Sequence, residues 1–203
     1  MIIQFPTPYP DELLYSIIAR YHIRSGNVFW KHTLEDLFGK RTISASVFLP
    51  SGIASLVQHL PKNTTLNEQM LIEKHTMYPF YTVFLPTEKA QSIYESMTSD
   101  DGKKIYMQSG IMASSIPQNR YLKYCSACAK EDVATYGELY WHRIHQLPGN
   151  LICPKHELWL ENSTVPITHS NKHAFILPTT SNCDLTKGRK ANGKRPSIIN
   201  IPR

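Results

Sequence analysis

Three of the four cysteines share one short stretch of the chain with a histidine, at the spacing of a metal site. Two residues separate Cys125 from Cys128, and the same gap separates Cys153 from His156 after 24 intervening residues. A two-residue gap lets one tight turn direct two side chains at a single ion, and two such turns supply a tetrahedral set of ligands. The pattern predicts one zinc ion with four protein ligands: Cys125, Cys128, Cys153 and His156.

The predicted zinc ion has a structural role. Four protein ligands leave no position for a reactive water, so the site is not expected to hydrolyse anything. Zinc binding contributes about 10–16 kcal/mol in small zinc-binding peptides, which exceeds the entropy cost of closing the loop between the two pairs. His142 and His145 lie in that loop and remain alternative fourth ligands, although neither has the two-residue spacing.

Disulfide bonds are the competing interpretation of the cysteines. The sequence starts MIIQFPTPYP, without the basic and apolar segments of a secretion signal. We therefore expect a reducing, cytoplasmic location, where disulfides are rare. Cys183 lies in a segment of different composition and is predicted to be a free thiol.

Motifs of the common enzyme classes are missing from the sequence. It contains neither Gly-x-Ser-x-Gly nor His-Glu-x-x-His, and Gly39-Lys40-Arg41-Thr42 lacks the upstream glycine of a phosphate-binding loop. The adjacent acids Asp11-Glu12 and Asp100-Asp101 are better explained by a helix start and a turn than by the metal chemistry of a nuclease. We expect a protein that is not an enzyme.

The positive charge is confined to the last part of the chain. The formal net charge is +6, and residues 171–203 hold seven basic residues and one acid, whereas residues 1–170 hold fifteen of each sign. A segment rich in Lys, Ser, Thr and Asn is predicted to be a mobile, basic tail. No apolar stretch approaches the ~20 residues that cross a bilayer, so no membrane partner is expected.

Helical periodicity dominates the first half of the sequence. Apolar residues recur every three or four positions, and prolines, acids and glycines mark the ends. Residues 77–86, MYPFYTVFLP, are predicted to be a connection lining the core. The helices are expected from Pro10 to about Arg24, from about Trp30 to Phe38, after a Ser51 cap to Leu60, from a Thr65 capping box to about His75, and from Thr87 to Thr98.

The cysteine-rich half has a different pattern. Residues 121–124 and 157–160 are predicted strands beside the two ligand pairs, and about Asp132 to Gln146 can carry one helix or two. The fold class is therefore mainly α, with a small α+β zinc-finger module and an N-terminal helical domain of the helix-turn-helix type. The predicted domains are 1–118 helical, 119–165 zinc finger and 166–203 basic tail.

Three segments of the sequence together carry a resemblance to a known family. The first is Phe5-Pro6-x-Pro8-Tyr9-x-Asp11-Glu12-Leu13-Leu14-Tyr15-Ser16-x-Ile18-Ala19-Arg20. The second is His75-Thr76-Met77-Tyr78-Pro79-Phe80-Tyr81. The third includes Arg120-Tyr121-x-x-Tyr124-Cys125-x-x-Cys128, Tyr136-Gly137-Glu138-x-x-Trp141-His142-Arg143, Leu147-Pro148 and Cys153-Pro154-Lys155-His156. In this order, and over about residues 5–160, the three segments resemble the TniQ family, specifically its TnsD branch of transposon target selectors.

The resemblance implies a role in cut-and-paste DNA transposition. Members of the family recognise the insertion target, or a complex already bound there, and recruit the transposon's AAA+ ATPase regulator. The resemblance also assigns the zinc ligands to the four residues named above. Short members work with RNA-guided effector complexes, which adds such a complex to the expected partners of this chain.

We therefore expect a non-catalytic adaptor that binds target DNA and the ATPase regulator. A zinc-stabilised helix-turn-helix transcription regulator is the alternative, and it would bind a symmetric operator as a dimer. Phosphate contacts need Lys and Arg side chains on the surface. The candidates are Lys40 and Arg41 after the second helix, and Arg120, Lys123 and Arg143 around the first ligand pair.

Overall fold

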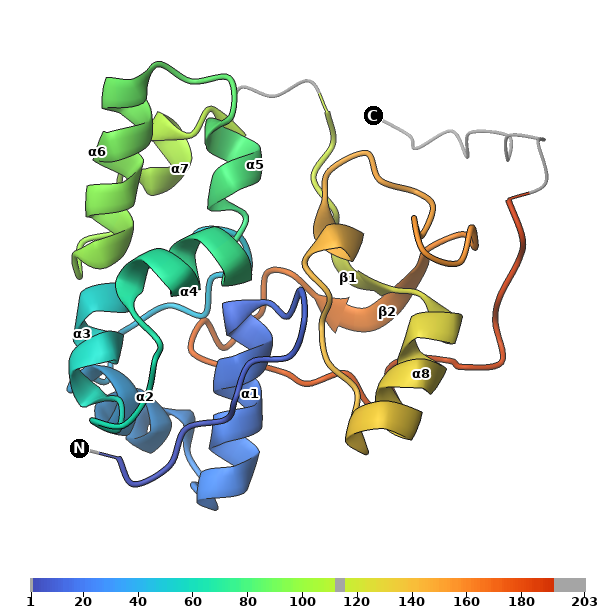
Figure 1. Cartoon of the computed structure of the whole chain (residues 1–203), viewed down its shortest axis with the longest axis horizontal. Helices are drawn as coiled ribbons and strands as arrows, with labels where there is room; N and C mark the ends of the chain where they lie inside the picture. The colour runs from blue at the N-terminus through green and yellow to red at the C-terminus, as the bar shows by residue number, and fades with distance from the viewer. Residues whose placement is uncertain (1, 112–115, 192–203) are drawn as a thin grey trace.

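One largely buried helix lies near the centre of the folded structure. In the computed structural model, which describes residues 2–111 and 116–191, α1 (Leu14–Ser25) buries every residue from Leu14 to Tyr21. The helix ends at Gly26, whose φ of 72° is left-handed and whose N–H bonds to the Ile23 carbonyl. Glycine adopts this conformation without steric cost. Figure 1 shows α1 between the other helices and the half of the molecule that holds the strands.

Six further helices make up the rest of the helical half, on the side of the molecule away from α8 (Ser126–Tyr136) (Figure 1). They are α2 (Trp30–Phe38), α3 (Ile53–His59), α4 (Glu68–His75), α5 (Tyr78–Thr82), α6 (Thr87–Thr98) and α7 (Ile105–Gln108). The predicted bounds of α2 and α6 are confirmed, whereas the short helices α5 and α7 were not predicted. Four residues join α1 to α2, which is the connection length of a helix-turn-helix. The assignment of a helix-turn-helix to α1 and α2 stays a prediction.

Three helix starts differ from the prediction. The first helix begins at Leu14 and not at Pro10, because Asp11 turns the chain with a φ of 56°. Gly52, and not Ser51, precedes α3 with a left-handed φ of 79°. The cap of α4 is Asn67, whose side-chain oxygen accepts the Met70 N–H at 2.8 Å. The observed starts lie within a few residues of the predicted ones, which is closer than sequence spacing alone can resolve.

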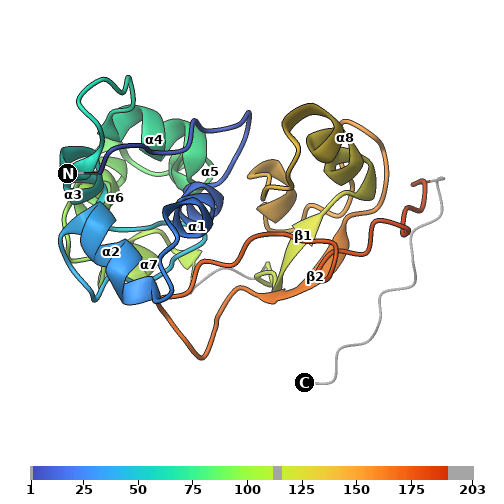
Figure 2. The same cartoon turned by 90° about the horizontal axis from the view of Figure 1, so that it is seen from below.

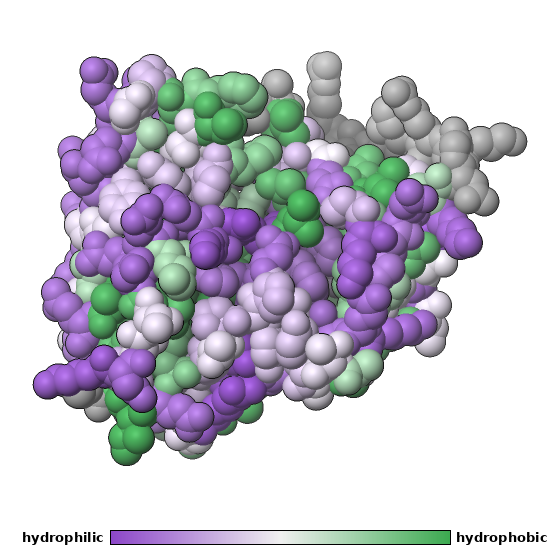
Figure 3. All heavy atoms as spheres, viewed as in Figure 1, coloured by the Kyte–Doolittle hydropathy of each residue, from purple (hydrophilic) through white to green (hydrophobic). Residues whose placement is uncertain are grey.

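The segment predicted to line the core is only partly buried. Met77 and Tyr81 pack against the core, but Phe80, Val83 and Phe84 are exposed, Phe84 by 95%. Figure 3 shows hydrophobic residues gathered at the upper end of the helical part, over α5 and its link to α6. The prediction for these last residues was wrong, since α5 turns them outward.

The second part of the chain is a small sheet with one helix. Strands β1 (Tyr121–Tyr124) and β2 (Glu161–Pro166) pair antiparallel, with Lys123 opposite Asn162 and a bulge between Tyr121 and Lys123. Helix α8 (Ser126–Tyr136) follows β1 directly, and a 3₁₀ turn, η2 (Ile144–Gln146), follows later. The strand β1 is confirmed, whereas residues 157–160 make only isolated bridges before β2 begins. A mainly helical fold with a small two-stranded sheet is confirmed.

The segment 167–191 packs against both parts, so the prediction of a mobile tail was wrong for it. Phe175 and Cys183 are buried in the main core. His173 donates from Nδ1 to the Ile43 carbonyl at 2.7 Å, and Tyr124 donates its hydroxyl hydrogen to the Asp184 carbonyl at 3.0 Å. Figure 2 shows this segment passing beneath α1 and the sheet. The rest of the predicted tail, residues 192–203, lies outside the described residues.

One hydrophobic core continues across the predicted domain boundary at residue 118. It joins residues of α1 to α7 with Leu122, Trp141, Val165 and Phe175, and a separate small cluster surrounds Cys125, Cys128 and Cys153. Among the described residues, none of the helices has the length and apolar character needed to cross a membrane.

Candidate metal centre and its contacts

The first ligand pair lies where β1 passes into α8. Cys125 is the residue preceding α8, with an extended backbone, and Ala129 N–H bonds to its carbonyl at 2.9 Å. Cys128 follows on the first turn of the helix, so both sulfur atoms lie at the helix start. The positive end of the helix dipole favours thiolates at this place.

The second ligand pair lies in a tight turn. Glu157 N–H bonds to the Cys153 carbonyl at 2.9 Å, and Cys153 N–H bonds to the Leu158 carbonyl at 2.8 Å. Glu157 closes the turn with a φ of 54°. These bonds bring His156 back over Cys153, and the two turns then face each other.

The structure brings the four predicted ligands together. One ligand atom from each of Cys125, Cys128, Cys153 and His156 lies within 4.8 Å of all the others. A tetrahedral zinc site with bonds of about 2.3 Å to sulfur and 2.0 Å to nitrogen requires S–S distances of about 3.8 Å and S–N distances of about 3.5 Å.

The observed separations fit that geometry. The Sγ atoms of Cys128 and Cys153 are 3.6 Å apart. His156 Nδ1 lies 3.6 Å from Cys125 Sγ, 3.7 Å from Cys153 Sγ and 3.2 Å from Cys128 Sγ. These four side chains could hold a metal ion.

The three thiols affect one another's ionisation. A hydrogen bond from Cys128 lowers the pKa of Cys125 to about 5. The same contact with Cys125, together with burial, raises the pKa of Cys128, and burial raises the pKa of Cys153. One buried thiolate thus opposes the ionisation of the next, and a divalent cation would remove that opposition.

Glu131 fixes the orientation of the histidine ligand. Its Oε1 accepts a hydrogen bond from His156 Nε2 at 3.0 Å, and its Oε2 pairs with Lys155 Nζ at 2.5 Å. A carboxylate on Nε2 leaves Nδ1 unprotonated and directed at the sulfur atoms. The ion pair with Lys155 and the hydrogen bond from His156 lower the pKa of Glu131.

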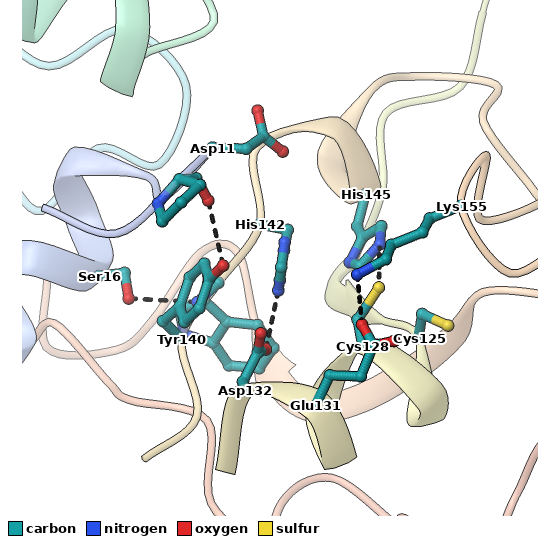
Figure 4. Close-up of polar contacts among 12 residues, drawn as sticks. Asp11, Ser16, Cys125, Cys128, Glu131, Asp132, Tyr140, His142, His145 and Lys155 are labelled. Atoms are coloured by element: carbon teal, nitrogen blue, oxygen red, sulfur yellow. Dashed lines mark hydrogen bonds and ion pairs between the residues drawn. The ribbon is translucent and has the colours of Figure 1, made fainter. Parts of the chain in front are cut away.

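The two other histidines of the loop are placed differently. His142 Nε2 lies 2.8 Å from Asp132 Oδ2, away from the sulfur atoms. His145 Nε2 lies 3.7 Å from Cys128 Sγ, and its Nδ1 has no hydrogen-bond partner among the described residues. Burial lowers the pKa of His145 to about 3, so the ring is neutral. Figure 4 shows His142 beside Asp132 and His145 above Cys128.

Backbone bonds join the metal-ligand region to the start of α1. Leu13 N–H bonds to the Trp141 carbonyl at 3.0 Å, and Trp141 N–H bonds to Ser16 Oγ at 3.1 Å. The Trp141 side chain is fully buried, and its Nε1 donates to the Ile176 carbonyl at 2.7 Å. One tryptophan thus connects α1, the loop before η2 and the segment after β2.

Arg143 and Asp11 form a second connection. Asp11 accepts Arg143 Nε at 3.2 Å and the Ile144 N–H at 2.9 Å, and the Arg143 N–H bonds to the Asp11 carbonyl at 2.7 Å. Arg143 Nη1 also donates to the carbonyls of Glu73, at 2.5 Å, and Thr76. Asp11 was predicted to begin a helix, but it holds the two parts of the chain together.

A buried charge group lies one helical turn further along α1 than Ser16. Arg20, 1% exposed, donates to Glu12 at 2.8 Å and to Glu138 at 2.8 Å. Burial raises the pKa of Glu12 to about 7, and the neighbouring Arg20 acts against that rise. Tyr9 covers this group, since its ring lies 3.7 Å from the Arg20 guanidinium and its hydroxyl donates to Glu138.

The five candidate phosphate contacts divide into two groups. Lys123 is buried and donates to the Asn150 carbonyl at 2.9 Å, and Arg143 is held as described above. The structure gives both side chains an internal partner, so we do not retain them as phosphate contacts. Arg120 is exposed; Lys40 is paired with Asp100, and Arg41 is paired with Glu35 at 2.6 Å on the surface.

The sequence reasoning named His145 only as an alternative ligand, and it missed the supporting roles of Glu131, Asp11 and Ser16. Glu131 and His145 contact two of the ligands, and Asp11 and Ser16 contact the ligand-bearing half from the helical half. Glu131 lies six residues after Cys125, so a carboxylate on α8 was an available signal. The contacts of Asp11 and Ser16 span more than 120 residues and have no local signal.

Comparison with known proteins gives two findings. A protein-family model described as TniQ matches residues 3–160. Over 152 residues the chain is 33% identical to the Escherichia coli protein described as Transposon Tn7 transposition protein TnsD. The aligned part is 75% of this chain but 30% of that relative, so the chain spans only about a third of its length.

Proposed function

Because this chain belongs to the TniQ family, we propose that it is a non-catalytic adaptor that selects the target of DNA transposition. It binds target DNA, or a complex bound there such as an RNA-guided effector, and recruits the AAA+ ATPase regulator of a transposon. The observation that carries the proposal is the extent of the family match. Residues 3–160 include α1 to α8 and all four clustered ligands.

The proposed cofactor is one structural zinc ion. Its ligands are Cys125, Cys128, Cys153 and His156, whose mutual distances suit tetrahedral coordination. Bound zinc would supply folding energy by holding the start of α8 against the turn at Cys153. The chain's own residues hold the pairs in place: Glu131 orients His156, and the bonds around Glu157 shape the turn.

The contacts around α1 support a role as one rigid adaptor. The core is continuous between the helical part and the sheet, and Trp141, Arg143 and Asp11 bond across them. A rigid body can transmit the position of a bound target to a second partner without losing binding energy to internal motion.

The proposed DNA contacts are surface cations. They include Arg120, Lys40 and Arg41, together with Lys187, Arg189 and Lys190, which are all exposed in the segment after β2. Removing one cation that neutralises a phosphate lowers the slope of log affinity against log salt by about 0.9. Replacing Lys187, Arg189 and Lys190 by Gln should therefore weaken DNA binding and flatten this slope by up to about three times that value. Lys89→Gln on α6 is the control and should leave the slope unchanged.

The adaptor role is tested with purified chain, target DNA and a purified AAA+ ATPase regulator from a transposon. We expect co-purification of the ATPase with the chain, salt-sensitive DNA binding and no cleavage of plasmid DNA with added Mg2+ or Mn2+. A dimeric footprint on a symmetric operator without any ATPase would instead support a transcription regulator. Nicking of the plasmid would show an enzyme.

A further inference from the structure

A buried histidine that is not one of the four clustered residues contacts the cluster from the other side. His145 is 1% exposed, and its Nε2 lies 3.7 Å from Cys128 Sγ. A sulfur atom accepts hydrogen bonds at longer distances than oxygen does, so this separation suits an N–H donor and a thiolate acceptor. Cys128 also faces His156 Nδ1 at 3.2 Å, so the sulfur lies between two imidazole rings.

The rest of the His145 ring gives no other reason for a histidine at this position. Its Nδ1 is buried, and no described residue offers it a hydrogen bond. An apolar ring would fill the same space without leaving a polar atom unpaired, and buried unpaired polar atoms are rare enough to indicate a function. The feature that His145 adds over an apolar residue is the Nε2 nitrogen that it directs at Cys128.

Neighbouring side chains hold His145 in this orientation. The His142 ring lies against it, with centroids 4.8 Å apart, and His142 is itself bonded to Asp132 and stacked on Tyr140 at 4.2 Å. Figure 4 shows these rings in a row that leads from Tyr140 to Cys128. Asp132 lies on α8, the helix that also carries Cys128, so one helix supports both the His142 ring and the sulfur atom that His145 contacts.

We propose that His145 is a positioning residue of the metal centre: its Nε2–H donates to the Cys128 thiolate, holding it and withdrawing negative charge from it. The inference rests on the proposed metal site, and it assigns a role to a residue outside the ligand set. A hydrogen-bonded thiolate gives up electron density less readily, and residues that orient ligands typically change metal affinity by about 10–100-fold when they are removed.

The test uses the full chain loaded with Co2+ in place of zinc, because cobalt thiolates have a charge-transfer absorption that reports on the sulfur. His145→Asn and His145→Gln form the decisive pair. The Gln amide nitrogen can reach the position of Nε2, whereas the shorter Asn amide reaches only the position of Nδ1. We expect the Asn variant to shift the band to longer wavelength and to release metal to a chelator about 10–100-fold faster. The Gln variant should retain the native band.

His75→Gln is the control for reduced stability. His75 is a buried histidine on α4 that donates to the Glu12 carbonyl at 2.7 Å, far from the sulfur atoms in the fold. It should unfold more easily than the native chain but keep the native band and release rate. An unshifted band and native release rate in the Asn variant would overturn the role of His145 while leaving the metal site intact. A native chain that takes up neither cobalt nor zinc would overturn both proposals.

Discussion

At the residue scale, the buried cysteines fall into two classes, one at the proposed metal centre and one in the main core. Cys153 is 1% exposed and lies within reach of two other sulfur atoms and one imidazole. Cys183 is equally buried, but it lies in the main core, and burial raises its pKa to about 12. The pair provides a test that separates metal binding from burial.

Cys153→Ser should lose one equivalent of zinc and lower the free energy of unfolding by more than about 4 kcal/mol, since the proposed zinc ion would stabilise the fold. Cys183→Ser should keep the zinc and cost about 1–3 kcal/mol, because it buries a hydroxyl in apolar surroundings. Elemental analysis and denaturant unfolding of both variants measure the difference. Equal metal content in the two variants would contradict the assignment.

His75 should make stability depend on pH. Burial lowers its pKa below the ordinary value of 6.5, so the folded protein holds the ring neutral. The unfolded chain binds the proton more readily below about pH 6.5, and stability should therefore fall as the solution is acidified through that range. His75→Gln should reduce this slope in denaturant titrations between about pH 7 and pH 5. His32→Gln, at an exposed position of α2, should retain the native slope.

The four clustered ligands were predictable because their signal is local. A repeated two-residue gap is visible in the sequence, and it places the side chains before any tertiary contact is known. Asp11 and Arg143 show the limit of such reasoning. Each looked like a surface charge, one at a helix start and one facing DNA, and their bond to each other joins positions 132 residues apart.

At the scale of elements, the periodicity of apolar residues predicted the main helices. Amino-acid composition led to a wrong prediction for residues 167–191, which were expected to be part of a mobile tail. The repeat of apolar residues in α1, α2 and α6 spans several turns and is hard to mistake. The polar segment after β2 has few apolar residues, and its position depends on single side chains such as Phe175. Average composition cannot show that one phenylalanine enters a distant core.

Phe175→Ala should destabilise the protein by about 3–5 kcal/mol, because the ring is 2% exposed and packs against Tyr15 and Trp30. Phe84→Ala is the matched control, since this ring is 95% exposed, and it should change stability by less than about 0.5 kcal/mol. Chemical denaturation of the two variants is sufficient. Equal effects would mean that Phe175 is not part of the core.

For the whole molecule, the helical half and the ligand-bearing half should unfold together. The main core contains residues of both, and the bonds of Trp141 and Arg143 cross between them. The predicted boundary at residue 118 therefore separates two patterns in the sequence but not two independent cores. We expect one cooperative transition for the metal-loaded chain.

Arg143→Ala should lower the free energy of this cooperative unfolding by about 1–3 kcal/mol, because the substitution removes the bonds of Arg143 to Asp11, Glu73 and Thr76 together. Arg41→Ala removes an exposed ion pair with Glu35 and should leave the unfolding temperature unchanged. Calorimetry gives both values. A split of the Arg143→Ala transition into two would show that this residue couples the halves.

The return of residues 172–176 to α1 sets a condition on synthesis of the chain. The hydroxyl of Tyr15 binds Ala174 and Ile176, and Lys172 bonds to Ala45. When the ribosome has synthesised α1 to α8, it has not yet synthesised residues 172–176, which pack against α1. An apolar face of α1 therefore stays uncovered during synthesis until residues 172–176 have emerged from the ribosome.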